Sequence, residues 1–88
     1  SPLVCEQARE LAQQVLSQTD LDDAARIRQA YQTCYQREPL SSETNRSLNF
    51  LKELEAAQPE TVPADRRRAA LRGLCRSLLA ANEFLFVE

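Results

Sequence analysis

Three cysteines and a run of arginines are the side chains in this sequence that could do chemistry. Cys5, Cys34 and Cys75 are separated by 29 and 41 positions, and the 88 residues include no His. The sequence therefore has neither the Cys and His ligands of a zinc finger nor the motif that attaches c-type haem. Three interpretations are open for the thiols: small buried hydrophobes, a Cys34–Cys75 disulfide with one free cysteine, or metal or redox chemistry. The first is favoured, because no His or basic residue lies on the same predicted helix faces to lower a thiol pKa.

The densest charge in the chain is Arg66-Arg67-Arg68, which Arg72 and Arg76 continue. Positive charges near a helix N-terminus oppose the helix dipole, so they need acidic partners or a bound anion. Steps of four residues place Arg68, Arg72 and Arg76 along one ridge. The preferred interpretation is solvated ion pairing with acidic residues elsewhere, namely Glu53, Glu55, Asp22 and Asp23. The alternatives are phosphate binding and a docking patch for a partner or another domain, formed by Arg66, Arg68, Arg72 and Arg76.

Four amphipathic helices must position these side chains. The clearest apolar stripe recurs at i, i+3, i+4, i+7 and i+8 and consists of Leu71, Leu74, Cys75, Leu78 and Leu79. Similar spacing elsewhere predicts helices over about 3–18, 21–37, 42–57 and 64–81. Few residues are β-branched and only one is Gly, which favours helix over sheet. We therefore predict a single all-α domain, either a compact four-helix bundle or an orthogonal helical domain.

The helix ends are predicted from capping residues and prolines. Thr19 or Asp20 is expected to cap the second helix, and Ser41 is expected to cap the third. The second helix should end near Arg37, two residues before Pro39, because the residue that precedes a proline disfavours helical backbone. Pro63 suits the first position of the fourth helix.

The apolar stripes also predict the core. We expect it to contain Ala8, Leu11, Val15, Ile27, Tyr31, Cys34, Leu48, Leu51, Leu74, Cys75, Leu78 and Phe84. Residues 82–88 are unusually apolar for a chain end, so we expect them to dock as a tail on the helices. Gly73 lies inside the fourth helix, where it costs about 1 kcal/mol relative to Ala, and it either permits a close helix crossing or is simply tolerated.

Composition narrows the classes of function. The net charge of −2 supplies no overall positive field for nucleic acid or anionic lipid. A helix-turn-helix interpretation is disfavoured, because the would-be recognition helix carries Glu43, Glu53 and Glu55. No apolar run approaches the roughly 18 to 20 residues that span a bilayer, and no segment resembles a signal peptide. Without His, a glycine-rich loop or a nucleophile motif, we expect no enzyme activity, cofactor or metal. The lack of Met predicts that the chain is excised from a longer protein.

Several segments resemble the C-terminal end of a domain of unknown function found in large planctomycete proteins. The matching segments are residues 2–9, 28–39, 74–79 and 82–88, of which the Arg-Glu-Pro turn at 37–39 and the tail Asn-Glu-Phe-Leu-Phe-Val-Glu are distinctive. Proteins of this family often carry a cytochrome-c-like haem domain near the N-terminus. The resemblance implies a helical C-terminal module of an exported, periplasmic or cell-envelope protein. It carries over no catalytic residue, and the haem motif belongs to another domain.

The expected function is therefore that of a non-catalytic interaction or scaffolding module. It would pack on other domains of its parent protein or on an unknown protein partner, and we expect a monomer in isolation. The alternative is an accessory part of an enzyme or redox site that other domains complete, to which this chain would contribute a thiol or arginines.

Overall fold

A computed structural model describes residues 2–17 and 22–85, with the side chains at positions 2, 4, 5, 16 and 82–85 excepted. Within these ranges the chain forms four helices and no strand: α1 (Pro2–Leu16), α2 (Asp23–Tyr35), α3 (Ser41–Ala57) and α4 (Pro63–Leu85). The predicted all-α fold with four helices is confirmed.

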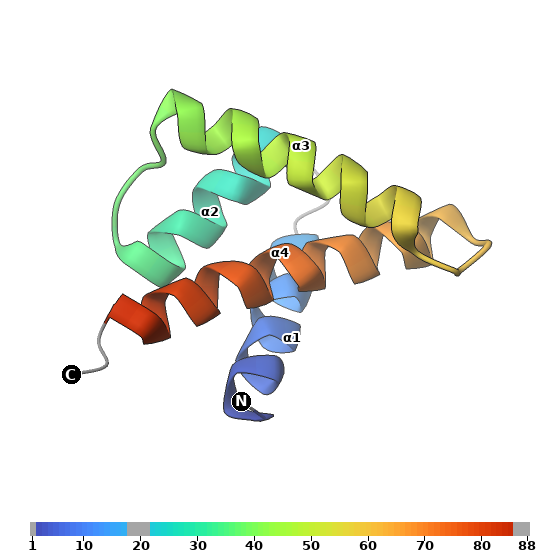
Figure 1. Cartoon of the computed structure of the whole chain (residues 1–88), viewed down its shortest axis with the longest axis horizontal. Helices are drawn as coiled ribbons and strands as arrows, with labels where there is room; N and C mark the ends of the chain where they lie inside the picture. Colours follow the sequence, from blue (N-terminus) through green and yellow to red (C-terminus); the bar gives the residue numbers. More distant parts are fainter. Residues whose placement is uncertain (1, 18–21, 86–88) are drawn as a thin grey trace.

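Helix α4 is the element around which the other three are arranged (Figure 1). It contacts α1, α2 and α3, whereas α1 and α3 make no contact with each other in the described ranges. α3 runs beside α4 in the opposite direction, and α1 crosses α4 on the far side from α3. This arrangement explains the long apolar stripe of α4, since the helix must bury surface against three neighbours.

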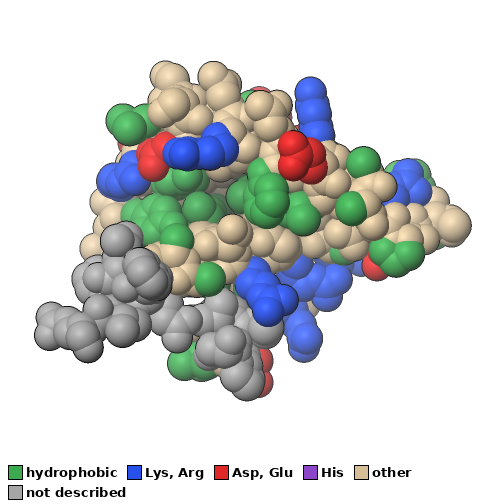
Figure 2. Space-filling view, in the orientation of Figure 1, with side chains coloured by type: hydrophobic (Ala, Val, Ile, Leu, Met, Phe, Trp, Pro, Cys, Tyr) green, Lys and Arg blue, Asp and Glu red, His purple; other side chains and the backbone are tan. Residues whose placement is uncertain are grey.

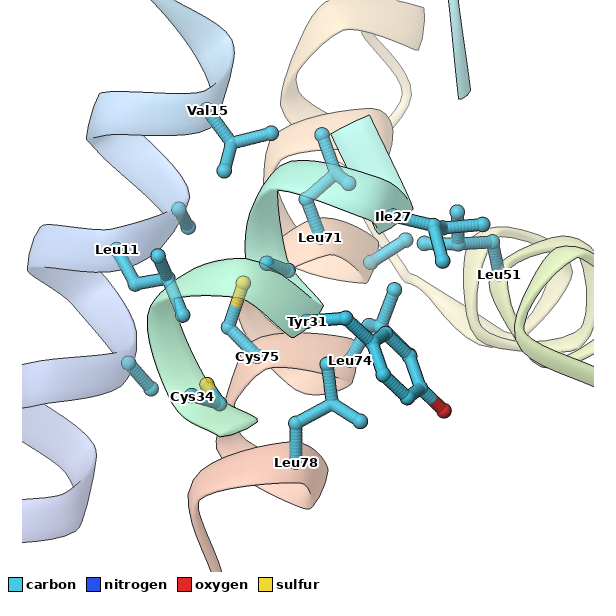
Figure 3. Packing of buried hydrophobic residues seen from close by; sticks show 14 residues of the cluster. Leu11, Val15, Ile27, Tyr31, Cys34, Leu51, Leu71, Leu74, Cys75 and Leu78 are labelled. Carbon is cyan, nitrogen blue, oxygen red and sulfur yellow. The ribbon is translucent and has the colours of Figure 1, made fainter. Parts of the chain in front are cut away.

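The core gathers where α1, α2 and α3 meet α4 (Figure 3). Ten of the twelve predicted core residues are buried: Ala8, Leu11, Val15, Ile27, Tyr31, Cys34, Leu51, Leu74, Cys75 and Leu78. Leu48 is only half-buried and packs against this cluster, and the side chain of Phe84 lies outside the described residues. The prediction omitted Leu71 and the small residues Ala12, Ala30 and Ala70, which are also buried. Alanines at these contacts let the helix backbones approach closely.

Both ends of α2 differ from the prediction, and the helix is shorter. The N-cap is Asp22, whose carboxylate accepts a hydrogen bond from the N–H of Ala25 at 2.8 Å. The predicted caps Thr19 and Asp20 lie outside the described residues. The helix ends at Tyr35 because the next residue takes the left-handed conformation (φ 57°, ψ 37°), which closes the last turn.

The N-cap of α3 was predicted one residue too late. The cap is Leu40, and its N–H donates to the carboxylate of Glu43 at 2.9 Å. A glutamate at the third helical position thereby satisfies a backbone donor, which is one half of a capping box. Ser41 is the first residue of the helix, so its hydroxyl is not the cap.

Helix α4 begins at Pro63 as predicted but continues to Leu85, four residues beyond the predicted end. No Gly or Pro follows position 73, so no residue in this stretch interrupts the helix. The backbone at 82–85 is therefore helical, whereas a separate tail was predicted to begin at 82. The side chains at 82–85 and all of residues 86–88 lie outside the described residues, as does the predicted docking of the tail.

Gly73 marks a close approach between α3 and α4. A Cβ atom at this position would lie 3.0 Å from Cδ1 of Leu54, which is tighter than an ordinary van der Waals contact. The nearest atom is the end of a flexible side chain and not backbone, so the two interpretations of Gly73 differ in whether Leu54 can move aside by a few tenths of an ångström.

Candidate functional site

The arginines at the start of α4 point in different directions and do different things. Arg66 donates to the backbone carbonyls of Glu60 at 3.1 Å and Thr61 at 2.9 Å, so it stabilises the connection between α3 and α4. Arg67 is half-buried and pairs with Asp23 of α2. It also lies 3.9 Å from Glu55 of α3, so one guanidinium links three helices. Arg66 and Arg67 are therefore structural residues.

Arg68, Arg72 and Arg76 are exposed and lie along one side of α4. Arg68 lies 3.3 Å from Asp65 one turn earlier on the same helix. Arg72 and Arg76 take part in no ion pair with any residue that the structure describes. The predicted pairing of this ridge with acidic residues of other helices is wrong. Arg67 makes those pairs instead, because its side of α4 faces α2 and α3.

A fourth arginine reaches the same surface from α1. Arg9 is exposed, and it shares a hollow of about 300 Å³ with Arg72 and Arg76. A smaller hollow of about 70 Å³ lies between Arg9, Arg68 and Arg72. We call Arg9, Arg68, Arg72 and Arg76 the arginine face. Figure 2 shows basic side chains gathered below α4. The contribution of Arg9 was not predicted, because the sequence gives no crossing geometry for α1 and α4.

Among the described residues, Glu60 is the one acidic residue that lines the larger hollow, and no acidic residue lines the smaller one. The Oε1 atom of Glu60 is buried and has no hydrogen-bond partner among the described residues. With Asp65, which pairs with Arg68, two carboxylates stand against four guanidinium groups, so the arginine face still carries a net positive charge although the whole chain has a net charge of −2.

The described cysteines do not form a reactive site. Cys34 on α2 and Cys75 on α4 are both free thiols and are 8% and 1% exposed (Figure 3). Burial raises the pKa of Cys34 to about 11 and the pKa of Cys75 to about 12. Both thiols are protonated at neutral pH, and the thiolate is the form that attacks electrophiles or binds metals. The Cys34–Cys75 disulfide is not formed in this structure, and the side chain of Cys5 lies outside the described residues.

A cluster of tyrosines and one arginine joins α2 to α3. Tyr31 and Tyr35 pack edge to face with ring centroids 5.2 Å apart, and the guanidinium of Arg37 lies 5.6 Å from each ring centroid. Arg37 also donates two hydrogen bonds to Glu43, at 2.7 and 2.9 Å. These bonds and the N–H of Leu40 lower the pKa of Glu43 to about 2. Every charged group of the cluster is paired, so its role is to hold the turn between α2 and α3.

The described residues form neither a cluster of metal ligands nor a membrane-spanning helix. Within residues 2–17 and 22–85, no three His, Cys, Asp or Glu side chains come together as metal ligands would. No helix in these ranges is both long enough and apolar enough to cross a bilayer.

Comparisons with protein-family models, with curated proteins and with solved structures found no match. The resemblance to a planctomycete domain, and the export that it implies, stay predictions.

Proposed function

We propose that this chain is a non-catalytic interaction module that binds an acidic protein surface through the arginine face. The observation that carries the proposal is that Arg72 and Arg76 are exposed, lie one helical turn apart and lack acidic partners among the described residues. Arg46 and Lys52 on α3 also lack ion pairs, but they are six positions apart and do not adjoin each other on the helix. Unpaired cations beside one another on a helix do not stabilise the fold, so a partner is the simplest source of their counter-charge.

The chemistry of guanidinium groups supports a protein carboxylate as the ligand. Arginine presents planar donors that match a carboxylate in bidentate fashion, and it is enriched in protein interfaces. The two hollows between α1 and α4 give the arginine face a concave shape in which acidic side chains can be enclosed. The acidic surface would belong to another domain of a larger exported protein, in keeping with the predicted resemblance, or to a separate partner.

A short polyglutamate peptide tests the proposal, with binding followed by fluorescence anisotropy at low salt. Polyglutamate should bind the wild-type chain although both carry net negative charge, because the positive charge is local. Arg72→Glu should weaken binding by roughly tenfold, the size expected when a close charge contact of about 1.4 kcal/mol is lost.

Lys52→Glu is the matched control. Lys52 is exposed on α3, forms no ion pair among the described residues and undergoes the same change of charge. It should leave binding within about twofold. Failure of polyglutamate to bind, or equal weakening by the two substitutions, would contradict the proposal.

A further inference from the structure

A second hollow surface lies between α3 and α4, away from the arginine face. Two adjoining hollows of about 610 and 750 Å³ share Tyr31, Arg46, Ser77 and Leu78 among their lining residues. Their floor includes the buried side chains of Leu74 and Leu78. Figure 2 shows hydrophobic side chains gathered in this groove, with basic and acidic side chains above it on α3.

One wall of the groove is a continuous strip of α3. The strip consists of Ser42, Asn45, Arg46, Asn49, Phe50 and Glu53, and we call it the α3 strip. Its members recur at i, i+3, i+4, i+7, i+8 and i+11, so they lie on one face of the helix. All are exposed except Phe50, which is half-buried at the centre.

The α3 strip carries two charges of opposite sign. Neither Arg46 nor Glu53 takes part in an ion pair with any described residue. They are seven positions apart, which places them two helical turns, or roughly 10 Å, from each other on the same face. The strip therefore presents a positive end and a negative end on either side of Phe50.

This arrangement is complementary to itself. If two copies meet with their α3 helices antiparallel about a twofold axis between Asn49 and Phe50, Arg46 faces the partner's Glu53 and Glu53 faces the partner's Arg46. A parallel alignment would instead oppose like charges. We propose, in place of the monomer expected from the sequence, that the α3 strip is the interface of a symmetric homodimer, in which each α3 lies against the groove of the other copy.

Specific interfaces commonly cover about one tenth of the surface of a small protein on each partner. For the 5925 Å² of accessible surface of this chain, that fraction corresponds to about 1,200 Å² in total, the lower limit for a specific interface. We therefore expect dissociation in the micromolar range, of about 10 to 100 μM. The proposal is independent of the proposed function, which uses the opposite side of α4.

Sedimentation analysis of the whole chain between about 1 μM and 1 mM tests the proposal, with charge-reversal variants supplying its specificity. The wild type should change from monomer to dimer over this range. Arg46→Glu and Glu53→Arg should each weaken self-association by at least about tenfold, because each opposes like charges twice in the symmetric pair. An equimolar mixture of the two variants should form a heterodimer, because one copy then presents two negative charges and the other two positive charges, so that both contacts are again ion pairs.

Arg72→Glu is the control, because it changes the charge equally on the arginine face and should leave dimerisation unchanged. Arg46→Glu should in turn leave polyglutamate binding unchanged. Self-association and polyglutamate binding are therefore measured independently, and one proposal can fail while the other holds. A monomer at 1 mM would overturn the dimer, as would self-association that survives both single variants or a mixture that does not associate. Helical circular dichroism of each variant checks that the exposed substitutions leave the fold intact.

Discussion

Replacing Arg72 by Ala should stabilise the fold. Arg72 is exposed, has no acidic partner among the described residues and has an arginine four residues away on either side, Arg68 and Arg76. Like charges at this spacing repel each other across one helical turn. The substitution removes both repulsions and puts the best helix former at the position.

The size of the gain follows from these contacts. Each like-charged pair at i, i+4 costs about 0.2 to 0.5 kcal/mol, so the two pairs cost roughly 0.4 to 1 kcal/mol. Asp65 lies 3.3 Å from Arg68 and offsets part of one repulsion. We expect the free energy of unfolding to rise by about 0.5 kcal/mol, which raises the melting temperature by roughly 2 to 4 °C.

Urea unfolding followed by circular dichroism, at low salt and again at high salt, is the assay. The gain should shrink at high salt, because salt screens exposed charges. Arg67→Ala provides the contrast: it removes the pairs with Asp23 and Glu55, so it should lower the free energy of unfolding by about 0.5 to 1 kcal/mol. If Arg72→Ala instead destabilises the chain as Arg67→Ala does, Arg72 has a structural partner and the reasoning behind the arginine face is wrong.

Three other perturbations test the packing and the pKa shifts. Glu43→Gln should lower the urea midpoint at pH 7. The difference in midpoint between wild type and variant should shrink as pH falls from about 4.5 towards 2, because a Glu43 pKa held at about 2 in the folded chain contributes stability that is lost when the carboxylate is protonated. A difference that stays constant over this pH range would count against the lowered pKa. Cys34 and Cys75 should each react with a thiol reagent at pH 8 at least about 100-fold more slowly in the folded chain than in urea, because burial lowers their thiolate fractions; equal rates would show that the thiols are accessible. Gly73→Ala should raise the free energy of unfolding by up to about 1 kcal/mol, because Ala has a higher helix propensity than Gly and the half-buried Leu54 side chain can rotate away from the new methyl group. A loss of stability would mean that Leu54 cannot move aside.

The sequence predicted most of the fold because helical spacing reports which side of each helix is buried. Leu11 and Val15 of α1 and Ile27 of α2 were assigned to one core and are buried together. The helix ends were predicted less well, since several residues near each end can cap. Leu40 has no side-chain acceptor, and its role as N-cap depends on a carboxylate three residues later.

The candidate site was predicted only in part, because a sequence does not give the angle at which helices cross. Arg68, Arg72 and Arg76 were placed on one ridge from their spacing, and they are exposed on one side of α4. Arg66 was grouped with them but bonds to loop carbonyls. Arg9 was missed because it is separated from the ridge by more than fifty positions and meets it only where α1 crosses α4.

The most direct test of the arginine face is an NMR titration of the ¹⁵N-labelled chain with polyglutamate. Arginine Nε–H signals report contact with a carboxylate at the side chain itself. The proposed function predicts that the signals of Arg9, Arg72 and Arg76 shift together and saturate at one peptide concentration, while that of Arg67 does not move. Shifts spread over all exposed arginines, or no shift at the arginine face, would contradict it.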